Sequence, residues 1–407
     1  MSPVWPFPRA DTLPPYAFVV TDAAKEKVLA RGADLIDLGL GNPDRPTPAE
    51  IVARLHEQAD VGRNHRYHPG PGIRPLREAA ARWYERRYSA RFDPDREIVI
   101  TMGAKEGMSH LCLAVLQEGD TTIVPDPCYP IHAGGPMIAG SAVEYYRTAG
   151  GVSPSAAIQA AIERVFARGK RPKLVIANYP QNPTGEVVTR EELSRLVRVV
   201  EESGAMLLHD LAYADLDFQH RYAPSIFDCG LDPERVKTFA VEAFSTSKSY
   251  NMAGWRIGLM VGNARMIGAL SHLKTYLDYG TFAPLQHAAA WALDHGDQFA
   301  EGFRELYRGR AKALVEGLTR AGWPVAEPRG TMFIWAPLPE PWQQLGSIAA
   351  ATRLIDEAHV AVSPGIGFGP GGDRHVRFAL IEDPPRLAEA CDRIGKLLRR
   401  DRDPAPR

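Results

Sequence analysis

The chain is poor in cysteine, in surplus charge and in long apolar runs. Its 407 residues include four cysteines, which lie far apart and form no C-x-x-C pair, so neither a zinc site nor a redox pair of that spacing is indicated. The formal net charge of −1 favours neither nucleic acid nor an anionic membrane as a partner. No apolar run approaches the roughly 20 residues of a membrane span, and the proline-rich start does not resemble a signal peptide. We therefore expect a cytoplasmic protein.

Length and pattern predict two domains, since a single hydrophobic core stops growing at roughly 250–300 residues. Apolar strand patterns alternate with helical ones from about Thr47, as is typical of a parallel sheet covered on both faces. We expect an α/β fold with an N-terminal arm or lid (1–46), a large domain with a mostly parallel sheet flanked by helices (47–284) and a smaller α+β domain (285–407). The strands expected in the large domain are 97–101, 121–124, 142–147, 173–177, 205–209, 238–243 and 257–261.

One lysine stands among small hydroxyl residues between two strand patterns, in Ser245-Thr-Ser-Lys248. A partly desolvated lysine near another cation loses its proton more readily, as Schiff-base chemistry requires. Arg256 supplies such a cation, and together with Ser245 and Ser247 it could bind a phosphate. A loop lysine beside a surface arginine explains the same spacing, so this segment alone leaves both interpretations open.

Two polar motifs come directly after apolar strands. Asn182, in Asn-Pro-Thr-Gly185, can both donate and accept hydrogen bonds. Asp210 ends a strand, where a carboxylate could keep a pyridinium nitrogen protonated, and Tyr213 could donate to a ring oxygen. An ordinary turn and a capping acid are the competing interpretations.

Three weaker signals complete the set. The segment Gly103–Lys105 leads from a strand into a helix, where backbone N–H groups can bind an anion. Tyr129 is held between prolines and could stack on a planar ring. Arg377 interrupts an apolar strand and needs an anionic partner, either a substrate carboxylate or a structural acid such as Glu382.

Together and in this order, the motifs resemble those of the class I/II aminotransferases, which are fold-type I enzymes that use pyridoxal 5'-phosphate (PLP). The resemblance covers nearly the whole chain, and segments 247–258, 279–282 and 362–369 resemble the bacterial glutamate–pyruvate (alanine) subgroup most closely. LL-diaminopimelate and aspartate aminotransferases share the motifs more loosely. The resemblance implies ping-pong exchange between an L-amino acid and a 2-oxo acid, alanine/pyruvate with glutamate/2-oxoglutarate, without a metal.

The resemblance also implies cofactor contacts. Lys248 would carry PLP as a Schiff base and move the substrate proton, Asp210 would pair with the pyridine nitrogen, and Asn182 and Tyr213 would contact the ring oxygen. The other residues implied to hold the cofactor are Gly103, Ala104, Lys105, Tyr129, Ser245, Ser247 and Arg256.

Substrate and subunit contacts follow from the same resemblance. Arg377 would bind the substrate carboxylate with help from Gly41 and Asn182, and Tyr16 would close over it. Tyr67 would reach the cofactor phosphate of a neighbouring subunit, which implies a homodimer with shared active sites.

Other functions share parts of this pattern. A lyase, decarboxylase or oxidase of the same fold would use the same cofactor motifs, and the loops after Asn182 and around 69–72 depart from the alanine-forming relatives, which leaves the amino donor open. A PLP-binding regulator would need a basic helix-turn-helix region, whereas about forty proline-rich residues precede the fold here. No G-x-G-x-x-G follows a strand, which argues against a dinucleotide-binding oxidoreductase.

Overall fold

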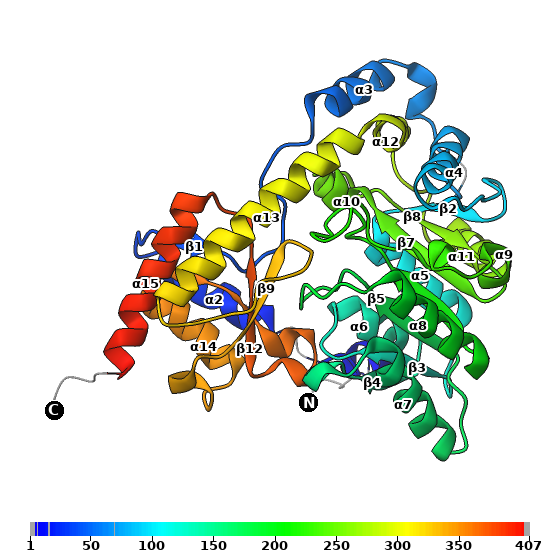
Figure 1. Cartoon of the computed structure of the whole chain (residues 1–407). Coiled ribbons are helices and arrows are strands. Elements are labelled where there is room, and N and C mark those ends of the chain that lie inside the picture. Colours follow the sequence, from blue (N-terminus) through cyan, green and yellow to red (C-terminus); the bar gives the residue numbers. More distant parts are fainter. Residues whose placement is uncertain (1–4, 6, 15–16, 69, 403–407) are drawn as a thin grey trace.

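The computed structural model describes residues 5, 7–14, 17–68 and 70–402, and its centre is a seven-stranded sheet (Figure 1). The strand order is β2-β8-β7-β6-β5-β3-β4. The strands are β2 (Ile98–Thr101), β3 (Thr121–Pro125), β4 (Ala142–Tyr146), β5 (Leu174–Asn178), β6 (Met206–Asp210), β7 (Ala240–Ser245) and β8 (Gly258–Gly262). Neighbours run parallel except that β8 is antiparallel to both β2 and β7. The expected mostly parallel sheet is confirmed.

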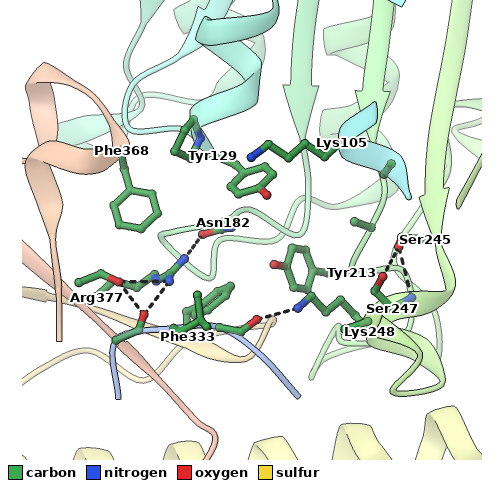
Figure 2. Close-up of a pocket in the computed structure, with 18 of the residues that line it drawn as sticks. Lys105, Tyr129, Asn182, Tyr213, Ser245, Ser247, Lys248, Phe333, Phe368 and Arg377 are labelled. Carbon is green, nitrogen blue, oxygen red and sulfur yellow. Dashed lines mark hydrogen bonds between the residues drawn. The ribbon is translucent and has the colours of Figure 1, made fainter. Parts of the chain in front are cut away.

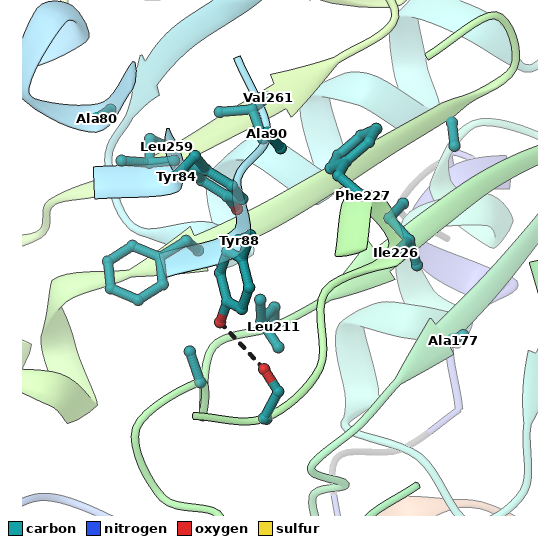
Figure 3. Packing of buried hydrophobic residues seen from close by; sticks show 14 of the residues in the cluster. Ala80, Tyr84, Tyr88, Ala90, Ala177, Leu211, Ile226, Phe227, Leu259 and Val261 are labelled. Atoms are coloured by element: carbon teal, nitrogen blue, oxygen red, sulfur yellow. Dashed lines mark hydrogen bonds between the residues drawn. The ribbon is translucent and has the colours of Figure 1, made fainter. Parts of the chain in front are cut away.

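Both faces of this sheet are buried. In β2, Ile98 and Ile100 belong to one hydrophobic core and Val99 to another, because successive side chains of a strand point to opposite faces. The first core is covered by α4 (Arg74–Tyr88), α7 (Pro154–Ala167), α8 (Arg190–Ser203) and α12 (Ala283–His295), and the second by α5 (Ala104–Val115), α6 (Pro130–Ile138) and α11 (Ala264–Leu277). Figure 3 shows part of the first core, where the Tyr88 hydroxyl donates to the Ala223 carbonyl at 3.1 Å.

Local signals fix the ends of the covering helices. At the start of α8 the Thr189 side chain accepts a hydrogen bond from the backbone N–H of Glu192 at 3.2 Å, which satisfies one of the free N–H groups of the first turn. The helix ends at Gly204, whose φ of 74° is left-handed and favours glycine. These caps define where α8 begins and ends in the segment that connects β5 to β6.

A second, smaller layer lies beside the large sheet (Figure 1). Its antiparallel sheet has the order β11-β12-β9, and β1 pairs with β10 in parallel. The strands are β1 (Ile36–Asp37), β9 (Phe333–Pro337), β10 (Val360–Ala361), β11 (Ser363–Pro364) and β12 (His375–Ala379). The helices around them are α2 (Phe18–Leu29), α13 (Asp297–Arg320), α14 (Ser347–Arg353) and α15 (Pro384–Arg402). Side chains such as Trp323 and Phe378 form a separate core here.

The other α-helices of the described residues are α1 (Pro8–Asp11), α3 (Ala49–Ala59), α9 (Pro233–Val236) and α10 (Thr246–Ser249). The expected boundary near residue 285 falls inside α12, which packs against α3 and α4, and the three-part division stays a prediction. Over the described residues, every helix is too short or too polar to cross a bilayer.

Candidate active site

A pocket of about 360 Å³ opens where the carboxyl ends of the large sheet face the smaller sheet (Figure 2). In open α/β sheets this is where ligands bind. The predicted site residues that line it are Gly41, Ala104, Lys105, Tyr129, Asn182, Asp210, Tyr213, Ser245, Ser247, Lys248, Arg256 and Arg377. The structure therefore brings together motifs that are spread over most of the chain.

Lys248 lies on the short helix α10, between β7 and β8, and its Nζ donates to the Gly41 carbonyl at 2.7 Å. Burial, followed by the positive charges of Arg377 and Arg256, lowers the pKa of the Lys248 amine to about 7. A substantial fraction of this lysine is therefore neutral and nucleophilic near physiological pH, unlike an exposed lysine.

Asp210 is the last residue of β6 and lines the pocket. Its Oδ2 lies 2.9 Å from Nε2 of His132, a fully buried residue of α6, and its Oδ1 accepts from the Ala212 backbone N–H at 3.1 Å. The carboxylate is thus held in one orientation. Sequence reasoning missed His132, whose only signal is its position three residues after Tyr129, on the same helical turn.

An anion cradle forms at the start of α5. Gly103 precedes the helix with φ 78°, and no side chain caps the free N–H groups of the first turn. A Cβ at Gly103 would lie 2.5 Å from Nη2 of Arg256, so only glycine allows the guanidinium this close. Helix N–H groups and an arginine together favour a phosphate. Gly103 itself backs this cradle rather than lining the pocket.

The hydroxyls of Ser245 and Ser247 lie on the same side of the pocket as Arg256. Ser245 Oγ and Ser247 Oγ are 2.9 Å apart, and the Ser247 backbone N–H donates to Ser245 Oγ at 3.2 Å. Lys105, in the first turn of α5, places its Nζ 5.9 Å from the centre of the Tyr129 ring. These groups surround the cradle with further donors and one flat aromatic face.

Arg377 projects from β12 on the opposite side of the pocket. Its Nη1 donates to Asn182 Oδ1 at 2.9 Å and its Nη2 to the Gly39 carbonyl at 3.0 Å. The guanidinium carbon lies 4.0 Å from the centre of the Phe333 ring and 4.5 Å from that of Phe368. Sequence reasoning missed both phenylalanines, because neither falls in a polar motif.

Besides Gly103, two predicted residues are not among those that line the pocket. Tyr16 lies outside the described residues. Tyr67 is 83% exposed and stacks on Tyr279 with ring centres 4.6 Å apart, so its predicted contact with a neighbouring subunit stays a prediction.

Away from the pocket, Glu106, His110 and Asp278 have potential metal-ligand atoms within 4.8 Å of one another. The fully buried Lys274 already places its Nζ 3.1 Å from Glu106 Oε1 and 3.0 Å from Asp278 Oδ2. An ammonium group therefore supplies the positive charge that these carboxylates require, and the cluster is an ion-pair network between α5 and α11.

The sequence and fold have clear relatives. The family profile of aminotransferase class I and II matches residues 33–394. Glutamate-pyruvate aminotransferase AlaC of Escherichia coli is 44% identical over 97% of this chain and 94% of its own length. LL-diaminopimelate aminotransferase of Desulforudis audaxviator is 38% identical over 96% of this chain and 97% of its own. A substrate-bound structure of BacF from Bacillus subtilis superposes with a TM-score of 0.88 at 32% identity, covering 97% of this chain and 98% of that one.

These matches agree with the geometry of a buried lysine, a strand-end aspartate and an anion cradle around one pocket. The protein belongs to the class I and II aminotransferases and is a PLP-dependent enzyme.

Proposed function

We propose that this enzyme exchanges the amino group between alanine/pyruvate and glutamate/2-oxoglutarate. The 44% identity to a glutamate-pyruvate aminotransferase over nearly the whole chain supports this pair. The observation that carries the proposal is that Lys248 and Arg377 face the same pocket, since an α-amino acid must present its amine and its carboxylate to two such groups at once.

The residues present fit PLP. The glycine-backed helix start with Arg256 suits the phosphate, the oriented Asp210 suits a pyridine nitrogen, and a substantial fraction of the Lys248 amine is neutral near pH 7. Ala104, Lys105, Ser245, Ser247 and Arg256 would hold the phosphate in the cradle that Gly103 backs, Tyr129 would hold the ring face, and Asn182 and Tyr213 the ring oxygen. When bound, PLP condenses with amines and withdraws electrons from the carbon that loses its proton.

The chain's own residues then divide the work of the reaction. Lys248 would hold the cofactor and, once the substrate amine has replaced it, would take the proton from the substrate Cα, since a base with a pKa near the working pH is the most effective. Arg377 would bind the substrate carboxylate in the plane of its guanidinium. Lys248 would also return the proton. Water would release the first 2-oxo acid before a second one enters, so ping-pong kinetics are expected.

A second substrate has support of its own. Several relatives named LL-diaminopimelate aminotransferase match at 33–38% identity over 95–96% of this chain. That substrate carries a second amine and carboxylate at its far end, so it would need further polar partners in the pocket.

Half-reactions separate these candidates. The PLP-loaded enzyme is mixed with L-alanine, L-glutamate, L-aspartate or LL-diaminopimelate, and the cofactor absorbance is followed as it changes to the pyridoxamine form. Alanine and glutamate are expected to react fastest, without release of ammonia or carbon dioxide. Faster reaction of LL-diaminopimelate would select the second candidate, and release of ammonia without the pyridoxamine form would indicate a lyase or an oxidase.

The active enzyme is proposed to be a homodimer in which Tyr67 of each subunit completes the partner's site. The support within this chain is a group of exposed apolar side chains next to Tyr67, namely Tyr276, Leu277, Tyr279 and Phe282. The mass in solution tests the proposal, with a dimer expected. For the shared site, Tyr67→Phe is expected to weaken PLP binding while the dimer persists, and unchanged PLP affinity in that variant would contradict it.

A further inference from the structure

A buried carboxylate outside the reacting groups joins the two layers. Asp126 follows β3, and its side chain is fully buried. Its Oδ2 accepts from Nε and Nη2 of Arg147, each at 2.7 Å. The backbone N–H of Gly371 donates to the same carboxylate, 2.9 Å from Oδ1 and 3.0 Å from Oδ2. Because a buried charge is costly unless it is paired and hydrogen-bonded, both partners are needed to hold it there.

Gly371 belongs to a glycine-rich stretch, residues 365–372, which we call the glycine segment. A Cβ at Gly371 would lie 2.9 Å from Asp126 Oδ2, and one at Gly369 would lie 2.6 Å from Oδ1. Any side chain at these positions would push the segment off the carboxylate. The Cys128 backbone N–H donates to the Phe368 carbonyl at 2.7 Å, so the segment is tied to the residues after β3 at two points.

The glycine segment carries Phe368 into the pocket, where its ring lies over the Arg377 guanidinium (Figure 2). The Phe333 ring lies on the other side of Arg377 in Figure 2, and its centre is 4.0 Å from the guanidinium carbon, so the guanidinium lies between two aromatic rings. A planar guanidinium binds a carboxylate best when its plane is fixed, because both N–H bonds must align together. The place of Phe368 depends on the segment, which in turn depends on Asp126.

We propose that Asp126 is a positioning residue for substrate binding: its carboxylate fastens the glycine segment so that Phe368 holds Arg377 in the orientation that receives the substrate carboxylate. This rests on the proposed role of Arg377. Asp126 touches neither the cofactor cradle nor Lys248, so its contribution falls on the affinity for amino acids and 2-oxo acids, and the cofactor chemistry is left intact.

The test uses PLP-loaded Asp126→Ala, Gly371→Ala and the double variant, with Gly309→Ala as the matched control because a Cβ there meets nothing within 4 Å. The amino acid is the one that reacts fastest in the half-reaction panel. Both single variants are expected to raise KM for the amino acid and for the 2-oxo acid by about tenfold, with kcat within about threefold of wild type and an unchanged cofactor spectrum. The double variant is expected to be no worse than the more affected single variant, because both substitutions break one contact.

Two further variants separate positioning from general damage. Asp126→Asn keeps an acceptor for Gly371 and should raise KM less than Asp126→Ala. Phe368→Leu should raise KM as the Asp126 variants do, whereas Phe368→Tyr should preserve it.

An unchanged KM in folded, PLP-loaded Asp126→Ala would overturn the proposal. Loss of PLP affinity along with KM would overturn it too, since it would assign Asp126 to the cofactor site or to the fold. If no amino acid reacts with the wild-type enzyme, the proposed function fails and this inference with it. If the wild-type enzyme reacts but Asp126→Ala leaves KM unchanged, only this inference is overturned.

Discussion

The two sides of the pocket are built in different ways. One side, which we call the sheet side, consists of residues at the ends of strands in one sheet, such as Asp210 and Lys248, and each is placed by the framework next to it. The other, the arginine side, depends on contacts between segments far apart in the chain: Arg377 donates to Gly39, 338 residues away. The sheet side is therefore set by the fold itself, and the arginine side by how two layers meet.

The largest expected effect is on the sheet side. Replacing Lys248 by alanine removes the amine that we propose binds the cofactor and moves the proton, so turnover should fall by more than the roughly 10²–10⁴-fold assigned to general acid–base catalysis alone. Single-turnover absorbance measures it, with Lys312→Ala, an exposed lysine on α13, as control. Turnover close to wild type in Lys248→Ala would remove the mechanism.

A smaller effect is expected from the arginine side. Arg377→Met removes the two charge-assisted hydrogen bonds that we propose it makes to the substrate carboxylate, each worth about 1.5–3 kcal/mol, so KM should rise by roughly 100-fold or more. Arg377→Lys should recover part of this, because an ammonium keeps the charge but not the paired N–H groups. The control is Arg374→Met, because Arg374 is an exposed residue directly before β12. If Arg377→Met lost PLP binding instead, the two sides would not be separable.

The phosphate cradle should tolerate loss of one hydroxyl. Ser247→Ala removes one donor to a charged group among several, so PLP affinity should fall about tenfold while KM for the amino acid stays near wild type. Equilibrium titration of the apoenzyme with PLP measures it, and Ser271→Ala, a partly buried position on α11, serves for comparison. A change in KM without a change in PLP affinity would mean that Ser247 acts in substrate binding rather than in PLP binding.

The smallest expected effect is a shift in the pKa of Lys248 on the sheet side, caused by the charge of Arg377 on the arginine side. Because the pKa of Lys248 is lowered to about 7, the fraction of neutral amine rises as pH increases through 7, and apoenzyme should take up PLP faster up to that point and level off above it. Arg377→Met removes one charge that lowers this pKa, so the midpoint should move to higher pH. Stopped-flow absorbance with both proteins in the same buffers measures the shift. A midpoint that stays in place would mean that the charge of Arg377 does not contribute to the lowered pKa, which would leave burial and Arg256 as its causes.

What could be predicted from the sequence follows the same division. Lys248, Asp210 and Asn182 stand in local motifs at the ends of apolar strands, and a parallel sheet brings such ends together, so their meeting could be inferred. His132, Phe333, Phe368 and Asp126 gain their contacts from residues distant in the chain. The sequence places His132 and Asp126 near Tyr129 but does not show what either side chain contacts. The antiparallel direction of β8 could not be predicted either, because the sequence pattern of a strand that is apolar on both faces is the same in both directions.

The carbonyls of Gly39 and Gly41 hold Arg377 Nη2 and Lys248 Nζ, respectively, and they are only two residues apart in the chain. One short backbone segment therefore accepts hydrogen bonds from both the amine and the guanidinium of the pocket. A displacement of residues 39–41 would change the positions of both groups at once.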